Sequence, residues 1–143
     1  MKLSTIIAGK GDFVATVLPD ATVADLTAML SEHGVGALVV SADGRTIAGI
    51  VSERDIVRAI SHGPAALEQP VASIMTTHVY TAPPEADVEE LMQVMTEKRV
   101  RHIPVTDPEG LLLGIVSIGD VVKSRLGELE GERAALMDYI TKG

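Results

Sequence analysis

Gly49-Ile50-Val51-Ser52-Glu53-Arg54-Asp55 recurs 65 positions later as Gly114-Ile115-Val116-Ser117-Ile118-Gly119-Asp120. The similarity extends outward from these two strings without a gap, so that residues 14–60 align with residues 79–125. Fifteen of the 47 aligned positions are identical, where unrelated sequences of ordinary composition would share about three or four. An internal repeat sets the architecture of a chain. Two copies predict two similar units packed about a pseudo-two-fold axis, with clefts between them.

Each copy predicts the element order β-α-β-β-α, a mixed α+β (α/β) fold. The opening segments Phe13–Val17 and His78–Ala82 read as extended chain and are followed by prolines, which favour strand edges or loops. Thr22 and Asp87 stand where a cap for the following helix is expected. Apolar periodicity and turn residues place the other elements: helices from residues 23 and 88, strands at 37–40, 103–105, 47–52 and 111–117, and second helices at 53–61 and 118–126.

Segments outside the repeats complete the expected organisation. The first repeat with a lead-in helix at 3–9 occupies residues 1–62, a linker occupies 63–77 and the second repeat occupies 78–126. Residues 127–143 form an amphipathic C-terminal helix with apolar Leu129, Leu136, Met137 and Ile140. The apolar side of this helix either packs on its own domain or makes a dimer contact.

Composition narrows the classes of function. The net charge of −8 and the three aromatic residues argue against a nucleic-acid binder. The chain has no cysteine, which excludes disulfides, thiolate nucleophiles and Cys-based zinc sites. The apolar runs are too short for a membrane span, and the N-terminal sequence is a poor signal peptide. We therefore expect a cytoplasmic protein that does not bind membranes.

The repeated Gly-x-x-Ser-x-x-Asp string has two readings. In the first, Ser52 and Ser117 cap a helix, and Asp55 and Asp120 suit the positive end of the helix dipole. In the second, the helix start holds a nucleotide: the serine and the free amides bind phosphate or ribose oxygens, and the carboxylate accepts the ribose hydroxyls. Duplication copies caps and sites equally, so both readings stay open.

A basic segment favours the second reading. Lys98, Arg99, Arg101 and His102 gather within five residues of an otherwise acidic chain, while the equivalents of the last two are Gly36 and Ala37. One interpretation is a solvated corner with Glu97 as the partner of these cations. The other is a phosphate site at Arg101 and His102, because arginine suits phosphate by its bidentate fork, with a bare surface at Gly36-Ala37 that admits a flat base.

These motifs resemble cystathionine-β-synthase-type (CBS) domains, which occur as tandem pairs called Bateman modules. The resemblance covers about residues 10–126 and rests on the two Gly-Ile-Val-Ser-x-x-Asp strings, the Gly-Ala-Leu-Val and His-Ile-Pro-Val strands, and Ile74-Met75-Thr76. Val-Arg-His-Ile-Pro-Val is also similar to bacterial proteins that consist of little besides the module. One departure is Leu38-Val39-Val40, which has no proline where the family often has one.

The resemblance implies a sensor for adenosine-containing ligands such as AMP, ADP, ATP, NAD or S-adenosylmethionine, with no required cofactor. In the family, the motif aspartate holds the ribose, the residues before it lie near ribose and phosphate, the opening strand gives backbone and hydroxyl contacts, and the short strand forms the base and phosphate pocket. Carried over in that order, the expected site comprises Asp55 and Asp120; Ser52, Arg54, Ser117, Ile118 and Gly119; Thr16, Val17, Thr81 and Ala82; and Gly36, Ala37, Leu38, Arg101, His102, Ile103 and Pro104. Because Arg54 and Gly119 differ between the copies, we expect the two clefts to differ in occupancy.

Three functions remain as hypotheses. The first is a regulatory module without catalysis of its own, which binds an adenine nucleotide, forms a homodimer as the family typically does, and acts on an unidentified partner protein. The second is a structural dimerisation module with empty clefts. The third is a nucleotide-processing enzyme, against which stand the dispersed histidines and the lack of a Gly-x-x-x-x-Gly-Lys-Ser/Thr loop. We expect neither catalytic residues nor a metal site.

Overall fold

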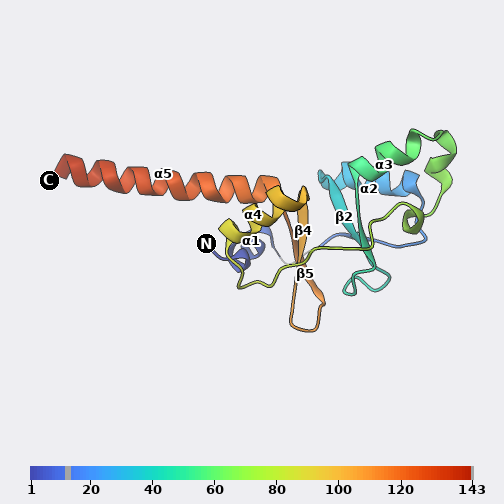
Figure 1. Cartoon of the computed structure of the whole chain (residues 1–143), viewed down its shortest axis with the longest axis horizontal. Coiled ribbons are helices and arrows are strands. Elements are labelled where there is room, and N and C mark those ends of the chain that lie inside the picture. The colour runs from blue at the N-terminus through green and yellow to red at the C-terminus, as the bar shows by residue number, and fades with distance from the viewer. Residues whose placement is uncertain (12–13, 143) are drawn as a thin grey trace.

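The computed structural model describes residues 1–11 and 14–142, which form two similar α/β halves and one long protruding helix (Figure 1). The first half contains β1 (Thr16–Val17), α2 (Val23–His33), β2 (Ala37–Val40), β3 (Gly49–Ser52) and α3 (Glu53–Ile60). The second half contains α1 (Leu3–Lys10), α4 (Val88–Lys98), β4 (His102–Thr106), β5 (Leu112–Ser117) and the first turns of α5 (Ile118–Lys142). The expected mixed α/β fold of two similar repeats is confirmed.

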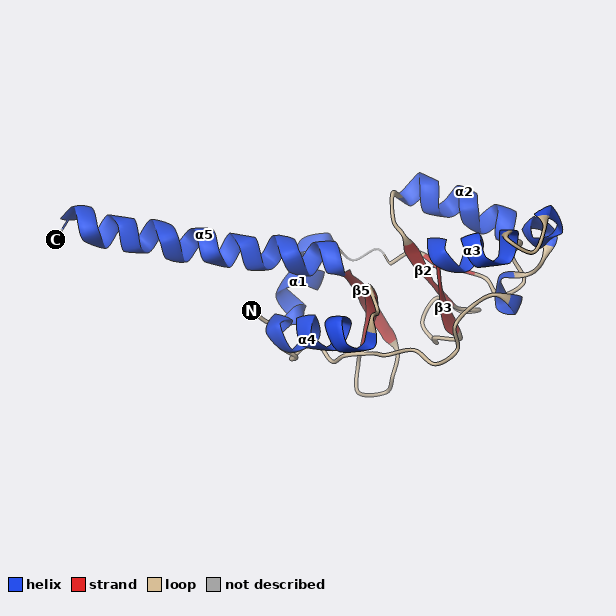
Figure 2. Cartoon of the chain, turned by 45° about the horizontal axis from the view of Figure 1, so that its top comes forward, coloured by secondary structure: helices blue, strands red, loops and turns tan. Residues whose placement is uncertain are grey.

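The first half is a three-stranded sheet with two helices on one side (Figure 2). Strand β2 lies in the centre, parallel to β1 and antiparallel to β3, with Ala37 opposite Ser52. All four residues of β2 are buried, as expected for a continuous apolar run. Helix α2 begins where the sequence predicts, because Thr22 and Asp25 form a reciprocal capping box. This packing leaves the end of β3 and the start of α3 at one edge of the sheet.

In the second half, β4 and β5 pair antiparallel, with His102 opposite Ser117. The expected strand at 78–82 is reduced to one parallel bridge, in which Ala82 pairs with Val105. Pro83 and Pro84 follow directly, and proline has no N–H to extend the pairing. Phe13, the expected start of the corresponding segment in the first half, lies outside the described residues. Helix α1 covers this half and buries Leu3 completely.

The two halves share chain segments, which fixes their relative position. Thr76, which precedes the second repeat, pairs with Ile50 of β3 through hydrogen bonds of 2.9 and 2.8 Å. The linker reaches this point through two 3-10 turns, Pro64–Glu68 and Val71–Ser73. The segment between the repeats therefore becomes part of the first half, and residues of both repeats meet beside α3.

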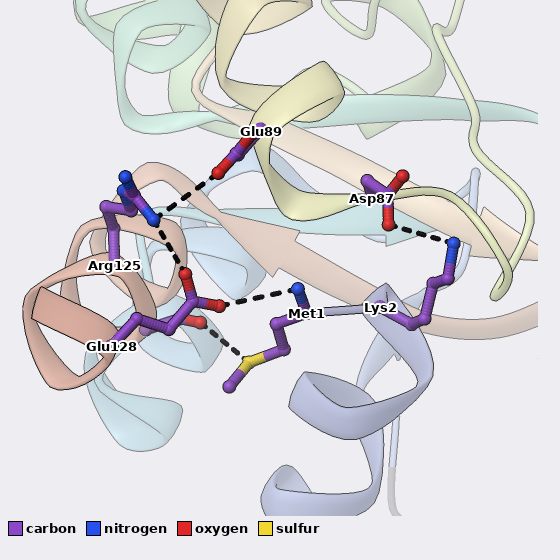
Figure 3. A network of polar contacts seen from close by, with 7 residues as sticks. Met1, Lys2, Asp87, Glu89, Arg125 and Glu128 are labelled. Atoms are coloured by element: carbon purple, nitrogen blue, oxygen red, sulfur yellow. Dashed lines mark hydrogen bonds and ion pairs between the residues drawn. The ribbon is translucent and has the colours of Figure 1, made fainter. Parts of the chain in front are cut away.

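Helix α5 runs without a break from Ile118 to Lys142, whereas the sequence predicts two separate helices that meet at residue 127. Gly127 and Gly131 cost about 1 kcal/mol each in a helix interior, but neither is followed by a proline and most of their neighbours are good helix formers. The first turns of α5 are held by ion pairs of Arg125 with Glu89 and Glu128 (Figure 3). The remainder extends away from both halves (Figure 1).

Asp87 stands at the N-cap of α4 as expected, but its side chain does not cap the helix. Its carboxylate instead binds Lys2 Nζ at 2.8 Å (Figure 3). The hydrogen bond and the charge of Lys2 lower the pKa of Asp87. The side-chain role predicted for Asp87 is therefore wrong, because Lys2, which is distant in sequence, lies close to it in the fold.

Candidate functional site

The repeated serine–aspartate motif of the first half lies at the start of α3. Ser52 is the last residue of β3, and its backbone N donates to Asp55 Oδ2 at 2.8 Å. The Ser52 hydroxyl donates to the same oxygen at 3.2 Å. Asp55 therefore organises the first turn of α3, as the capping interpretation predicts. No hydrogen bond to its other oxygen, Oδ1, exists among the described residues, so that oxygen can accept from a ligand.

A cavity of about 550 Å³ opens beside this turn. Its volume lies within the range of small-molecule pockets, about 300–1,000 Å³. Both repeats and the linker contribute to it, because the linker pairs with β3. The lining residues are Gly36 and Ala37 from β2 and the turn before it; Ile50, Ser52, Glu53, Arg54, Asp55, Val57 and Arg58 from β3 and α3; Thr76 from the linker; and His78, Val79, Tyr80, Arg99, Val100, Arg101 and His102 from the second repeat.

The cavity is basic although the chain as a whole is acidic. Four arginines line it, against the two carboxylates of Glu53 and Asp55. Within the described residues, none of these arginines has a carboxylate within ion-pair distance; the arginine that does form ion pairs is Arg125. A cluster of cations without carboxylate partners is suited to bind an anion such as a phosphate.

His102 and Gly36 lie together where the two repeats meet. A β-carbon built on Gly36 would stand 3.5 Å from His102 Cε1 and 3.7 Å from Glu53 Cδ. This is ordinary contact distance, so a side chain longer than alanine at residue 36 would compete with His102 for space. Burial, with a smaller effect of the positive charge of Lys10, lowers the pKa of His102, while Asp120 and Glu53 oppose that shift. Gly36 and Ala37, where the sequence predicts a bare surface, both line the cavity; Gly36 lies next to the imidazole of His102, and the side chain of Ala37 is buried.

The second copy of the motif has a different environment. Asp120 Oδ2 accepts the backbone N of Ser117 at 2.9 Å and also binds Lys10 Nζ at 2.8 Å. Lys10, the last residue of α1, donates in addition to the carbonyl of Ile115. Partial burial would raise the pKa of Asp120, but the hydrogen bonds from Lys10 and Ser117 outweigh it and lower the pKa. Asp120 is thus already paired with a cation, and it does not line the cavity.

The structure brings part of the predicted site together. Gly36, Ala37, Ser52, Arg54, Asp55, Arg101 and His102 line the one cavity. The side chains of Val17, Leu38, Ala82, Ile103 and Pro104 are buried, four of them within the two hydrophobic cores. Contacts from these five to a ligand would have to come from the backbone. Six further residues do not line this cavity: Thr16, Thr81, Ser117, Ile118, Gly119 and Asp120.

Several residues that line the cavity were missed by sequence reasoning. Tyr80 is one of only three aromatic residues in the chain, and its rarity was a usable signal. Its ring meets the imidazole of His78 edge-on, with ring centroids 5.3 Å apart. Arg58 lies one helical turn after Arg54. Arg99 belongs to the basic segment that the sequence singles out, but no pattern separates it from Arg101.

The described residues contain no group of three or more His, Asp or Glu side chains that could hold a metal ion. None of the helices described is both long enough and apolar enough to cross a membrane.

The fold and the cavity define a duplicated α/β module whose two repeats share one pocket. The CBS domain family matches residues 12–62 and 71–127. The chain belongs to the CBS-domain family, as a tandem pair of these domains.

Similar proteins agree with this assignment. The mitochondrial CBS domain-containing protein CBSX3 of Arabidopsis thaliana is 42% identical over 129 residues, 87% of this chain; the chain spans 62% of that relative's length. The crystal structure of the CBS-domain containing protein ATU1752 from Agrobacterium tumefaciens has a TM-score of 0.82 at 40% identity, over 87% of this chain and 99% of that one. The structure of CBSX2 in complex with AMP has a TM-score of 0.72 at 25% identity, over 80% of this chain and 89% of that one.

Proposed function

We propose that this protein is a regulatory module that binds an adenosine nucleotide of the AMP, ADP, ATP, NAD or S-adenosylmethionine class and has no catalysis of its own. The observation that carries the proposal is the cavity in which the Asp55 carboxylate lies with four arginines that lack carboxylate partners. The Asp55 carboxylate is suited to accept hydrogen bonds from ribose hydroxyls, and the arginines are suited to bind phosphate, so that one nucleotide would engage both. The AMP complex of a related CBS protein supports this ligand class.

The proposed binding mode follows the chemistry of the cavity. Oδ1 of Asp55 accepts the ribose hydroxyls, as carboxylates do in other nucleotide sites. The base lies against Gly36-Ala37, near Tyr80. The phosphate binds Arg101 and His102, where arginine gives bidentate contacts.

A structural dimerisation module with an empty cavity is the second candidate. The apolar side chains of α5 favour dimerisation, because they are exposed among the described residues. Dimerisation is compatible with nucleotide binding, whereas an empty cavity is not; we also propose that the protein forms a homodimer and acts on a partner protein. A cytoplasmic location stays a prediction.

The test of nucleotide binding is a thermal-shift and calorimetry panel of AMP, ADP, ATP, NAD and S-adenosylmethionine. We expect at least one ligand to raise the melting temperature, with a rise that grows with the logarithm of its concentration above its Kd, because a ligand that binds only the folded state stabilises it. Asp55→Ala should weaken that ligand about 10-fold or more, the loss of one or two hydrogen bonds to a charged group.

Asp25→Ala is the matched control. Asp25 occupies the same third helical position in α2 and accepts from Thr22 N at 3.1 Å, but it lies outside the cavity. Both variants lose a helix cap, so a larger loss of ligand affinity in Asp55→Ala than in Asp25→Ala would report the contact of Asp55 with the ligand. Asp120→Ala should weaken binding less than Asp55→Ala does. A panel without any shift, or equal affinity losses for Asp55→Ala and Asp25→Ala, would contradict the proposal.

A further inference from the structure

Arg99 has an unusual backbone conformation at the end of α4. Its φ of 54° and ψ of 39° are left-handed, and within the described part of the chain it is the one residue other than glycine with a positive φ. The equivalent residue of the first repeat, 65 positions earlier, is Gly34, with φ 64° and ψ 37° at the end of α2. Both repeats therefore end their first helix in the same way, but only the second places a side chain there.

That side chain has an energetic cost. The left-handed conformation is unfavourable for residues with a β-carbon by about 1–2 kcal/mol, and glycine avoids this cost. The first repeat shows that glycine fits the same turn. Strain of this kind is often found at functional sites.

The position of Arg99 indicates what the side chain does. Arg99 lines the cavity, and among the described residues the arginine that forms ion pairs is Arg125, not Arg99. It is joined there by Arg101 from the same repeat and by Arg54 and Arg58 from α3. The cations thus approach the cavity from two different repeats.

The number of arginines in the cavity indicates how many phosphate groups the ligand carries. A bidentate guanidinium uses two oxygens, and one terminal phosphate has only three oxygens. Four arginines therefore exceed what a single phosphate can engage. Glu53 and Asp55 offset only part of their charge.

We propose that the cavity takes a nucleoside di- or triphosphate, and that Arg99 binds the phosphates beyond the first. This inference rests on the proposed function and makes its ligand class more specific. Arg99 is then the residue that distinguishes ATP and ADP from AMP, and the strain at its backbone is retained because glycine cannot supply the charge.

The experiment measures binding of ATP, ADP and AMP by calorimetry, in buffer with EDTA so that metal ions do not contribute. The wild-type protein should prefer ATP to AMP. Arg99→Gly and Arg99→Gln should each weaken ATP about 10-fold and AMP less than about 2-fold, the loss of one charged contact.

Melting temperatures distinguish the effect of the Arg99 charge from the effect of its strained backbone. Arg99→Gly should raise the melting temperature of the ligand-free protein by roughly 3 °C, because it removes the unfavourable conformation, whereas Arg99→Gln should not. Gly34→Gln is the matched control: it introduces the same strain in the first repeat, at a residue that does not itself line this cavity, and should lower the melting temperature without changing the preference for ATP.

The possible outcomes are distinct. Equal affinity of the wild type for ATP and AMP, or equal losses of both in Arg99→Gly, would overturn the inference. If the wild type binds none of AMP, ADP, ATP, NAD and S-adenosylmethionine, the proposed function fails, and inorganic tripolyphosphate then tests Arg99 alone. Weaker tripolyphosphate binding by Arg99→Gly supports an oligophosphate site, and unchanged or absent binding overturns it.

Discussion

Asp55 and Asp120 occupy the same position of the repeated motif, yet their carboxylates have different partners. Both accept the backbone N of the serine three residues before them, at 2.8 and 2.9 Å. Only Asp120 also binds a lysine, and that lysine, Lys10, is 110 residues away in the sequence. The motif therefore specifies the helix start in both repeats, whereas the availability of the carboxylate for a ligand depends on the neighbouring elements.

The titration of His102 makes the stability of the folded protein depend on pH. Burial and the nearby Lys10 lower its pKa below the ordinary value of 6.5, against the opposing charges of Asp120 and Glu53; Arg101 acts in the same direction as Lys10. Between its folded-state pKa and pH 6.5, His102 is therefore mostly neutral in the folded protein and mostly protonated in the unfolded chain. The contribution of His102 to stability is present above pH 6.5 and is lost as the pH falls through its lower folded-state pKa.

We expect the free energy of unfolding of the ligand-free protein to fall more steeply below pH 6.5 in the wild type than in His102→Gln. Urea denaturation from pH 8 to pH 5 measures both slopes, and the difference between the two proteins removes the contribution of other groups. Identical slopes would show that His102 titrates with its ordinary pKa.

Among the elements, β3 and β5 carry the same Gly-Ile-Val-Ser sequence but have different neighbours. A β-carbon on Gly49 would lie 2.7 Å from the backbone O of Thr76 and 2.8 Å from Met75 Sδ. A β-carbon on Gly114 would lie 2.6 Å from Ile7 Cδ1, the tip of a side chain that can rotate away. Strand β3 therefore packs against the backbone at Thr76, whereas β5 packs against the Ile7 side chain, which can move.

This contrast gives a matched pair of substitutions. Gly49→Ala should destabilise the protein by about 2 kcal/mol, within the range for overpacking, and should also weaken ligand binding, because Thr76 lines the cavity. Gly114→Ala should cost less than about 1 kcal/mol, since repacking of Ile7 relieves the contact. Urea denaturation and nucleotide titration of both variants test the prediction, and equal costs would refute it.

At the scale of the whole molecule, the outer part of α5 is exposed along its length and is not covered by any other described segment of the chain. The helix is about 37 Å long at 1.5 Å per residue, and an isolated helix gains little stability in water. Residues separated by four and three positions form one apolar row along it, interrupted once by Arg133: Val122, Leu126, Leu129, Leu136 and Ile140. Leu136 and Ile140 are 59% and 61% exposed. This spacing is typical of a helix that pairs with another helix.

We expect the protein to be a dimer in which this row is buried, so that Leu136→Glu should shift it to the monomer. Ala134→Glu is the control, because residue 134 lies about 120° around the helix from the row. Light scattering coupled to size-exclusion chromatography measures the mass of each. A wild-type monomer, or a Leu136→Glu variant that stays dimeric, would rule out this contact.

The sequence by itself determined the duplication, the β-α-β-β-α order of the first repeat, the capped start of α2, the family, and the placement of Ser52 and Asp55 at the start of a helix. These features follow from local spacing, which fixes how a segment folds. Arg101, His102, Gly36 and Ala37 were also predicted, and the structure places all four in one cavity.

Only the tertiary structure decided which groups meet across the repeats. It paired Lys10 with Asp120 and Lys2 with Asp87, brought Arg58, Tyr80 and Arg99 into the cavity, and turned the side chains of Leu38 and Ile103 into the cores. Such contacts join residues far apart in the chain, and they depend on how the halves dock and how the linker crosses β3. Local periodicity carries no information about that docking, because it describes one element at a time.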